Sequence, residues 1–198
     1  MWDERFSQPG YLYGTEPNDF LAEMAGEIPF GRVLSLAEGE GRNSVHLAGL
    51  GYEVVGVDSS AVGLEKARQL AADRGVVIET VLADLADPDT FEIEPASWEG
   101  IVSIFCHLPA ELRRRIHRRV VEGLRPGGVF LLEAYTPRQL EYGTGGPRDP
   151  DRLMSLGELR SELQGLDFLH AREIEREIHE GALHDGLGHV VQVVARKG

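Results

Sequence analysis

Short apolar runs alternate with longer amphipathic stretches along this chain of 198 residues. The apolar runs have the length and β-branched content of strands, and the amphipathic stretches have apolar side chains at helical spacing. The predicted strands cover residues 33–36, 53–57, 76–81, 101–105, 129–135, 168–180 and 189–194. The predicted helices cover residues 16–28, 44–50, 61–74, 110–124 and 156–163. This alternation is typical of an α/β fold with a mostly parallel sheet.

Several helix ends carry their own signals. Thr15 is predicted to cap the first helix, and Ser59 and Ser60 precede the helix that starts near residue 61. Ser155 and Glu158 have the spacing of a capping box at the start of the last helix. Residues 1–15 contain four aromatic side chains but are broken by proline and glycine, so no good helix is predicted there.

The first strand runs directly into two glycines, Gly39 and Gly41, before a helix begins. Glycine allows a positive φ and leaves the backbone open to a ligand, and nucleotide-like ligands bind at such strand-to-helix turns. The second strand ends in Asp58, 17 residues beyond Gly41. An α/β nucleotide fold places there the carboxylate that binds ribose hydroxyls.

The charge of the turn distinguishes two ligands that both suit this pattern. A dinucleotide brings a pyrophosphate, which Glu38 and Glu40 would repel. S-adenosylmethionine brings a sulfonium and an ammonium, which the same carboxylates would attract. Ser44 also stands where a dinucleotide fingerprint has its third glycine. The turn therefore favours S-adenosylmethionine over NAD.

Five motifs spread over nearly the whole chain carry a resemblance to a known family. They are Trp2-Asp3-Glu4-Arg5-Phe6 with Gly14-Thr15-Glu16-Pro17-Asn18, Ala37-Glu38-Gly39-Glu40-Gly41-Arg42-Asn43, Gly56-Val57-Asp58-Ser59, Ala83-Asp84-Leu85 and Leu124-Arg125-Pro126-Gly127-Gly128. With them the chain resembles the class I S-adenosylmethionine-dependent methyltransferases, most of all the small tellurite-resistance-type branch. It departs from the usual glycine loop in two places: Ser35 stands where many members have Asp, and Ala37-Glu38 replaces Gly-Cys.

The resemblance implies a three-layer αβα sandwich, with a Rossmann-like, mostly parallel seven-stranded sheet and an antiparallel C-terminal strand inserted between two others. It implies that Asp84 accepts a hydrogen bond from the adenine amino group and that a neighbouring apolar side chain packs on the ring. The full set of residues expected to bind the donor is Glu38, Gly39, Glu40, Gly41, Arg42, Asp58, Ser59, Asp84, Leu85, Phe105 and Cys106.

The candidates for chemistry follow the fourth and fifth strands. In an open α/β sheet the ligand crevice lies beyond the carboxyl ends of the strands, so Cys106 and His107 should face the donor. Cys106 is better explained as a small buried apolar residue than as a nucleophile. His107 is a candidate proton acceptor, and Tyr135 is a second catalytic candidate.

Two segments are candidates for the acceptor side. The resemblance implies that residues 1–15 form a lid over the donor, with Arg5, Tyr11, Tyr13 and Asn18 on the acceptor side. His184, near a C-terminal turn, is also expected to reach the substrate cleft. The structural alternative is a tail whose aromatic side chains hold it to the core. Residues 136–152 are too long for an ordinary connection. We expect both segments to form one cover that orders when the donor is bound.

Length, charge and composition restrict the classes of partner and the cellular location that we expect. The length suits one domain over residues 1–198, divided into an N-terminal lid and helix (1–30), a donor-binding core (31–135) and a substrate loop, helix and C-terminal hairpin (136–198). A net charge of −13 argues against nucleic acid and anionic membranes and favours a small-molecule substrate. The chain shows neither a signal sequence nor a membrane span, so a cytoplasmic location is expected.

Two residue clusters receive structural interpretations. The arginines of residues 110–124 lie mostly off the apolar stripe and are predicted to form a solvated helix face. His179, His184 and His189 are evenly spaced but lack a carboxylate or cysteine at a fixed partner spacing, so no metal site is predicted.

The sequence thus predicts methyl transfer from S-adenosylmethionine to a small acceptor, with a thiol or a chalcogen oxyanion as the candidate nucleophile. The alternative from another class is a non-catalytic protein that binds the donor as a sensor or scaffold, which the unusual Ser35 and Ala37 would suit. A Rossmann-type oxidoreductase is disfavoured, because the chain has no Tyr-x-x-x-Lys pair and no separate substrate domain.

Overall fold

The centre of the computed structural model, which describes residues 2–181 and 183–198, is a sheet of seven strands in the order β3-β2-β1-β4-β5-β7-β6. The strands are β1 (Arg32–Leu36), β2 (Glu53–Asp58), β3 (Glu79–Leu82), β4 (Trp98–Ile104), β5 (Leu124–Tyr135), β6 (Leu166–His179) and β7 (Asp185–Lys197). Neighbours from β3 to β5 are parallel, whereas β7 runs antiparallel to both β5 and β6. The predicted fold class is confirmed, including the insertion of the last strand between two others.

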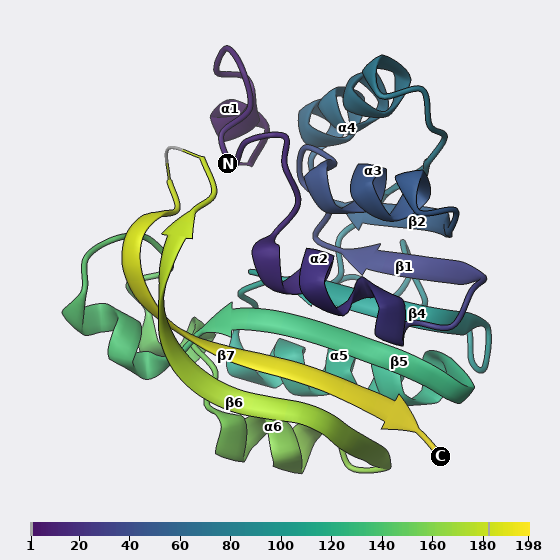
Figure 1. The fold of residues 1–198 in the computed structure, drawn as a ribbon, viewed down its shortest axis with the longest axis vertical. Coiled ribbons are helices and arrows are strands. Elements are labelled where there is room, and N and C mark those ends of the chain that lie inside the picture. Colours follow the sequence, from purple (N-terminus) through teal and green to yellow (C-terminus); the bar gives the residue numbers. More distant parts are fainter. Residues whose placement is uncertain (1, 182) are drawn as a thin grey trace.

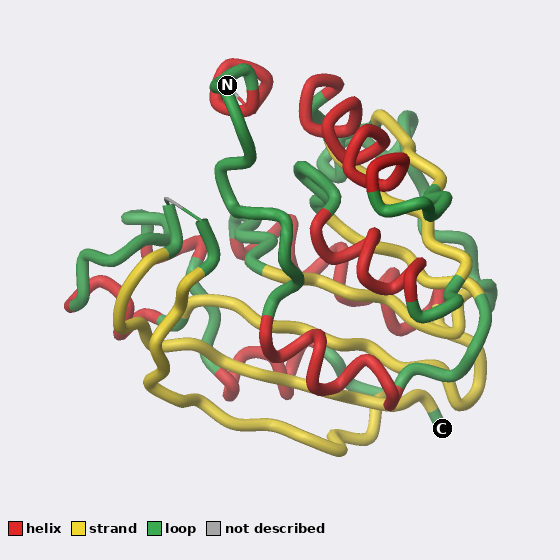
Figure 2. The backbone as a smooth tube through the Cα atoms, turned by 45° about the horizontal axis from the view of Figure 1, so that its top comes forward, coloured by secondary structure: helices red, strands yellow, loops and turns green. Residues whose placement is uncertain are grey.

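Helices cover both faces of this sheet (Figures 1 and 2). They are α1 (Trp2–Phe6), α2 (Asp19–Met24), α3 (Arg42–Gly49), α4 (Ala61–Asp73), α5 (Ala110–Gly123) and α6 (Leu156–Glu162), with short 3-10 helices at Ala25–Glu27 (η1), Pro137–Glu141 (η2) and Pro150–Arg152 (η3). Apolar side chains of α2 and α3 pack on one face of the sheet. Those of α5 and α6 pack on the other. The central strands are therefore covered on both sides, as their nearly continuous apolar sequences require.

The N-terminal segment is more regular than its sequence suggests. Residues 2–6 form the helix α1, although no good helix was predicted there. Asp3 Oδ1 accepts hydrogen bonds from Ser60 Oγ at 2.5 Å and from the Val62 amide at 3.2 Å. These contacts hold α1 against the start of α4, so tertiary packing stabilises a helix that local propensity does not predict.

Three local predictions are wrong. Asn18, rather than Thr15, caps α2, because its side-chain oxygen accepts the Leu21 amide. Strand β3 begins at Glu79 instead of residue 76, because the β-branched side chain of Val77 is 88% exposed and pairing with β2 starts only at Glu79. Propensity indicated a strand at residues 76–78, but these residues do not pair with β2, although β2 itself begins at Glu53.

The third wrong prediction concerns Arg113 of α5, which was assigned to a solvated face. Its side chain is 1% exposed and donates to Glu162 Oε1 at 2.8 Å and to Glu158 Oε1 at 3.1 Å. Burial of an arginine is tolerated when its charge is paired and its donors are satisfied. This pair holds α5 against α6. Among the helices of the described residues, none is long and apolar enough to cross a membrane.

Candidate functional site

A cavity of about 630 Å³ opens at the carboxyl ends of β1, β2 and β4, beneath α1 and the β6–β7 turn. The order of the strands places the crevice there, because β1 connects to β2 on one side and β4 lies on its other side. The residues predicted for the site that line this cavity are Arg5, Tyr13, Glu38, Gly39, Glu40, Arg42, Asp58, Ser59, Asp84, Leu85, Phe105, Cys106, His107 and His184.

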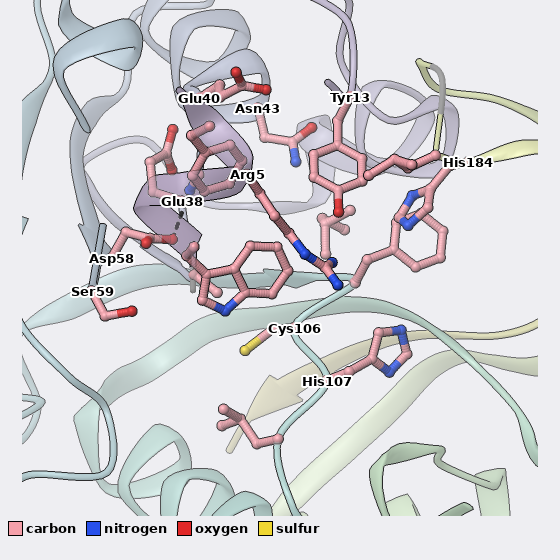
Figure 3. A pocket seen from close by; sticks show the side chains of 18 of the residues that line it. Arg5, Tyr13, Glu38, Glu40, Asn43, Asp58, Ser59, Cys106, His107 and His184 are labelled. Carbon is pink, nitrogen blue, oxygen red and sulfur yellow. Dashed lines mark hydrogen bonds between the residues drawn. The ribbon is translucent and has the colours of Figure 1, made fainter. Parts of the chain in front are cut away.

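The cavity is divided by charge. Figure 3 shows Glu38, Asp58 and Ser59 gathered on one side, Tyr13, His184 and His107 on the other, and the Arg5 side chain reaching between them. The lining carboxylates come from the ends of β1, β2 and β3, and they are Glu38, Glu40, Asp58 and Asp84. The lining from β4 onward contributes two histidines and two arginines, namely His107, Arg148, Arg152 and His184. We call these the acidic half and the basic half of the cavity.

The turn after β1 has a strained, left-handed backbone. Gly39 and Gly41 have φ of 61° and 96°, and Ala37 has φ of 52°. A non-glycine residue in this region is rare and costs about 1 kcal/mol or more, so the surrounding structure must impose it. The resemblance places a glycine at Ala37, and the structure shows why.

Glu38 lies at the centre of the acidic half. Its side chain accepts a hydrogen bond from Ser44 Oγ at 2.5 Å through Oε2, while its other oxygen, Oε1, is buried without a hydrogen-bond partner. Burial raises the pKa of this carboxyl to about 7. Gly56 lies below it, where a Cβ atom would come within 2.7 Å of Glu38 Cγ. The structure therefore holds an unpartnered carboxylate oxygen at the turn.

Asp58 holds the same turn from β2. Its Oδ2 accepts the Gly39 amide at 2.9 Å, and its Oδ1 accepts the Ser60 amide at 2.8 Å. Burial raises the pKa of Asp58 despite these hydrogen bonds. Each carboxylate oxygen has a second lone pair, so Asp58 can shape the turn and accept a ligand hydroxyl as well.

Glu40 is occupied by the N-terminal segment. Its Oε2 accepts the Leu12 amide at 2.7 Å and its Oε1 accepts Lys66 Nζ at 2.9 Å. Lys66 Nζ also donates to the carbonyls of Gln8 and Gly10 at 2.9 and 2.6 Å. The expected attraction of a cationic ligand by Glu40 is therefore reduced, because an ammonium already pairs with it. Glu40 instead helps to hold residues 8–12 over α4.

Arg42 is the first residue of α3, and its two terminal guanidinium nitrogens have different surroundings. Its Nη2 donates to Glu180 Oε2 at 2.5 Å, whereas its Nη1 is buried without a hydrogen-bond partner. The orphaned Nη1 and the orphaned Glu38 Oε1 are of opposite charge and belong to the same turn. Together they would complement the ammonium and the carboxylate of an amino acid.

The basic half is lined by aromatic rings. Phe105 leaves β4 with a left-handed φ of 52°. Its ring centroid lies 4.6 Å from that of His184, and the His184 ring is 4.7 Å from Tyr13. Burial lowers the pKa of His184 to about 3, with Arg42 contributing in the same direction, so this imidazole is neutral at physiological pH.

The protonation of His107 follows from its hydrogen bond. Its Nδ1 lies 3.1 Å from the carbonyl oxygen of Arg152, which can only accept, so Nδ1 carries the proton. Nε2 then has a free lone pair, and it is buried without a partner. Burial lowers the pKa of His107 to about 4, which keeps the ring neutral. His107 thus presents a hydrogen-bond acceptor in the basic half.

Four residues predicted for the site do not line the cavity. Gly41 instead permits the approach of α4, because a Cβ there would lie 2.6 Å from Ala67 Cα. The Tyr11 ring contacts Lys66, and its hydroxyl donates to the Lys66 carbonyl at 3.4 Å. Asn18 is fully buried as the cap of α2.

Tyr135 is the fourth of these residues, and it lies behind the wall of the cavity. Its ring is 1% exposed and contacts Phe105 at 4.7 Å and His107 at 5.6 Å between centroids. Burial raises the pKa of its hydroxyl, so a phenolate that could act as a base is disfavoured. Tyr135 supports the rings that face the cavity.

Several residues of the lining were not predicted as site residues, although three of them belong to the motifs of the resemblance. The chief ones are Trp2, Phe6, Asn43, Arg148 and Arg152. Arg148 and Arg152 lie in the segment 136–152 that was expected to cover the acceptor. Their positive charge in an acidic chain was a usable signal. The three evenly spaced histidines have separate surroundings: His179 pairs with Asp185, His184 faces the cavity and His189 bonds Thr136.

Comparison with known proteins identifies the segment that builds the acidic half. Residues 33–128 match the family model described as "Methyltransferase domain". Residues 33–128 are a methyltransferase domain. The cofactor of this methyltransferase domain is S-adenosylmethionine, as the sequence predicted. The opposite charges of the unpartnered Glu38 and Arg42 atoms fit the two charges of its amino-acid end, and Asp58, Asp84 and Leu85 line the same cavity.

Two relatives share this methyltransferase domain. The chain is 27% identical over 143 residues to the 2-heptyl-1-hydroxyquinolin-4(1H)-one methyltransferase of Mycobacteroides abscessus, covering 71% of this chain and 62% of that protein. It is 30% identical over 136 residues to the glycine/sarcosine N-methyltransferase of Halorhodospira halochloris, covering 67% of this chain and 47% of that protein. The matches thus span less than two thirds of each relative.

A solved structure shares the fold of the methyltransferase domain and of the segments around it. TehB from Haemophilus influenzae superposes with a TM-score of 0.73 at 22% identity, covering 100% of this chain and 66% of that one. The likeness extends to the N-terminal segment and to the β6–β7 hairpin, because the whole chain is covered.

Proposed function

We propose that the protein transfers the methyl group of S-adenosylmethionine to a small-molecule acceptor whose nucleophile is a thiol or a chalcogen oxyanion, as expected of the tellurite-resistance-type branch. The observation that carries this proposal is the charge division of the cavity. The acidic half suits a cationic donor, and the basic half, with Arg148 and Arg152, suits an acceptor that is anionic or becomes so.

The donor would be held by the turn and its neighbours. Arg42 Nη1 would bind the carboxylate and Glu38 Oε1 the ammonium, and Asp58 would accept the ribose hydroxyls. Asp84 and Leu85 would receive the adenine. When bound, S-adenosylmethionine supplies a methyl group that is already activated by the sulfonium.

The protein's task is then alignment and exclusion of water. The cover is made by Trp2 and Phe6 of α1, whose rings stack at 5.6 Å, and by Tyr13 and His184. Lys66 and Glu40 hold the N-terminal segment down, as described above. In this proposal, residues 1–30 and 136–198 cover and complete the donor-binding core of residues 31–135.

His107 would accept a proton from an acceptor that carries one. A thiol that enters the basic half can donate its S–H to the bare Nε2, and the thiolate then attacks the methyl carbon. An oxyanion carries no proton on its nucleophilic atom and needs only the cationic side chains. The low pKa of about 4 makes the imidazole a weak base, which suits a thiol better than an alcohol.

Product analysis tests the proposal. The protein is incubated with methyl-labelled S-adenosylmethionine and, separately, with benzenethiol, 2-mercaptoethanol, selenite, tellurite, phenol and an aliphatic amine. We expect labelled methyl thioethers or methylated chalcogen species together with S-adenosylhomocysteine. Transfer only to phenol or to the amine would contradict the acceptor class, and donor binding without transfer to any acceptor would favour the sensor alternative.

A further inference from the structure

A buried ion network lies next to the cavity, and the proposed reaction does not use it. Arg176 of β6 donates to Glu133 of β5 at 2.7 Å and to Glu180 at 2.6 Å. Asn18 Nδ2 donates to the same two carboxylates at 2.7 and 2.8 Å. Glu180 Oε2 accepts Arg42 Nη2 at 2.5 Å. The network therefore joins the donor turn to β5, β6 and the cap of α2.

The buried charges of this network balance, with two carboxylates and two guanidinium groups, and the exposed Asp19 adds a third carboxylate at 3.4 Å from Arg176. Glu133 is 0% exposed and Glu180 is 5% exposed, so each charge depends on its partners. Within the described residues, Glu180 is the member that contacts Arg42. Loss of Glu180 would therefore separate the donor turn from the rest of the network.

Glu180 also begins the turn that carries His184 into the cavity. Its amide donates to the His184 carbonyl at 2.8 Å, and the His184 amide donates to Gly181 at 3.4 Å. At Gly181, with φ of 79°, an added Cβ would lie 2.3 Å from the Leu12 carbonyl oxygen. The turn thus packs closely on the N-terminal segment, and Figure 1 shows the tip of the β6–β7 hairpin beside that segment.

Arg42 connects this turn to the donor. Its Nη2 binds Glu180, while its Nη1 is buried without a hydrogen-bond partner among the described residues, and Arg42 lines the acidic half of the cavity. A ligand carboxylate on Nη1 would fix the guanidinium plane, because the two nitrogens belong to one rigid group. Fixing that plane also fixes the direction in which Nη2 meets Glu180.

We propose that Glu180 is a positioning residue that, through Arg42, makes the turn carrying His184 tighten when the donor binds. The donor-occupied protein then presents His184 to the acceptor in one orientation. The role of His184 toward the acceptor rests on the acceptor class of the proposed function, whereas the link between donor binding and the turn rests only on the proposed contact of the donor carboxylate with Arg42. The chain thereby favours binding of the donor before the acceptor.

Amide hydrogen exchange with S-adenosylhomocysteine as the probe tests this link without an acceptor. In the parent protein, saturating S-adenosylhomocysteine should slow exchange at residues 183–187 by about tenfold or more. In Glu180→Gln the ligand should still bind and still slow exchange in α3, but exchange at residues 183–187 should change by less than about twofold. Glu177→Gln is the matched control, because it removes an exposed carboxylate from β6, three residues before Glu180, and should behave like the parent.

Arg42→Lys provides a second route if Glu180→Gln unfolds. A lysine keeps the charge, but one ammonium cannot serve Glu180 and the cavity with the fixed geometry of a guanidinium. We expect it to bind the probe more weakly and, at saturation, to lose the slowing at residues 183–187. Glu180→Gln should also affect turnover and donor affinity differently. The value of kcat should fall by roughly thirtyfold, whereas the donor Kd should change by less than about threefold.

The outcomes separate this inference from the proposed function. The positioning role is overturned if the probe slows exchange at residues 183–187 as much in Glu180→Gln, or in saturated Arg42→Lys, as it does in the parent. Normal coupling of the turn to the probe, without methyl transfer to any thiol or oxyanion, overturns the proposed function and leaves the positioning role in place.

Discussion

The acidic and basic halves of the cavity are built in different ways. The acidic half is made by consecutive elements of the chain, β1, its glycine turn, β2 and the loop after β3, and backbone amides of the turn are fixed by Asp58. The basic half is made by side chains from segments that lie far apart in the sequence, namely the end of β4, the 136–152 segment and the β6–β7 turn. Donor recognition is therefore local in sequence, whereas acceptor recognition depends on long-range packing.

The largest expected effect is at Gly41, and it tests whether the acidic half depends on backbone geometry. Gly41→Val would place a branched side chain at φ of 96° and within 2.7 Å of the Ala67 backbone and side chain. We expect the free energy of unfolding to fall by about 4 kcal/mol, measured by urea denaturation. Gly75→Ala is the control, because φ there is also positive at 69° but no atom lies within 4 Å, and about 1 kcal/mol should be lost. Equal losses would contradict the packing role of Gly41.

The next effect concerns the pH dependence of stability. The folded pKa of Glu38, about 7, lies above the ordinary value of 4.5 for a glutamate. Its contribution to stability is therefore greatest below pH 4.5 and is lost as the pH rises through 7, by about 3 kcal/mol. Glu38→Gln should remove this loss when urea denaturation is compared at pH 5 and pH 8. An unchanged pH slope in the variant would show that Glu38 is ionised normally in the folded protein.

A binding measurement also tests the protonation state of Glu38. The ammonium group of S-adenosylhomocysteine favours the ionised form of Glu38, so binding near pH 7 should release up to about half a proton per site. Calorimetry in buffers of different ionisation enthalpy measures this release. Glu38→Gln should abolish it.

A smaller effect is expected at Asp58. Asp58→Ala should weaken binding of S-adenosylhomocysteine by about 2 kcal/mol, measured by calorimetry, through loss of charge-assisted hydrogen bonds. The Gly39 and Ser60 amides also lose their acceptor, so the melting temperature without ligand should fall too. Asp84→Ala is the comparison, because among the described residues the Asp84 side chain accepts only the nearby Ala86 amide, so its loss should cost less in both measurements. Parent-like affinity in Asp58→Ala would remove this carboxylate from the donor site.

The smallest effect tests the basic half. Arg148→Gln and Arg152→Gln should each raise the KM for an anionic acceptor by about tenfold, or 1.4 kcal/mol, without altering the donor Kd. Arg138→Gln is the control, because Arg138 lies outside the cavity beside His189. Equal effects on donor and acceptor would show that the two halves are not separate.

The fold and the acidic half could be predicted because their signals are local. The apolar runs located each strand to within a few residues, and the order of elements required a mostly parallel sheet. The turn with Gly39 and the carboxylate of Asp58 belong to adjacent strand ends, so their meeting follows from topology. The misplaced start of β3 and the cap of α2 are errors of a different kind, because pairing partners and competing caps are supplied by tertiary structure.

The sequence by itself determined the α/β class, the glycine turn, the preference for a sulfonium donor and the capping box of Ser155 and Glu158. Each of these rests on residues that are neighbours in the chain or follow from the order of strands. Only the tertiary structure decided that Arg113 is buried, that Tyr135 lies behind the cavity wall and that Glu180 meets Arg42 from 138 positions away. Such contacts depend on where β7 enters the sheet and how far its hairpin extends, because burial and pairing of charges arise only when distant segments exclude water together.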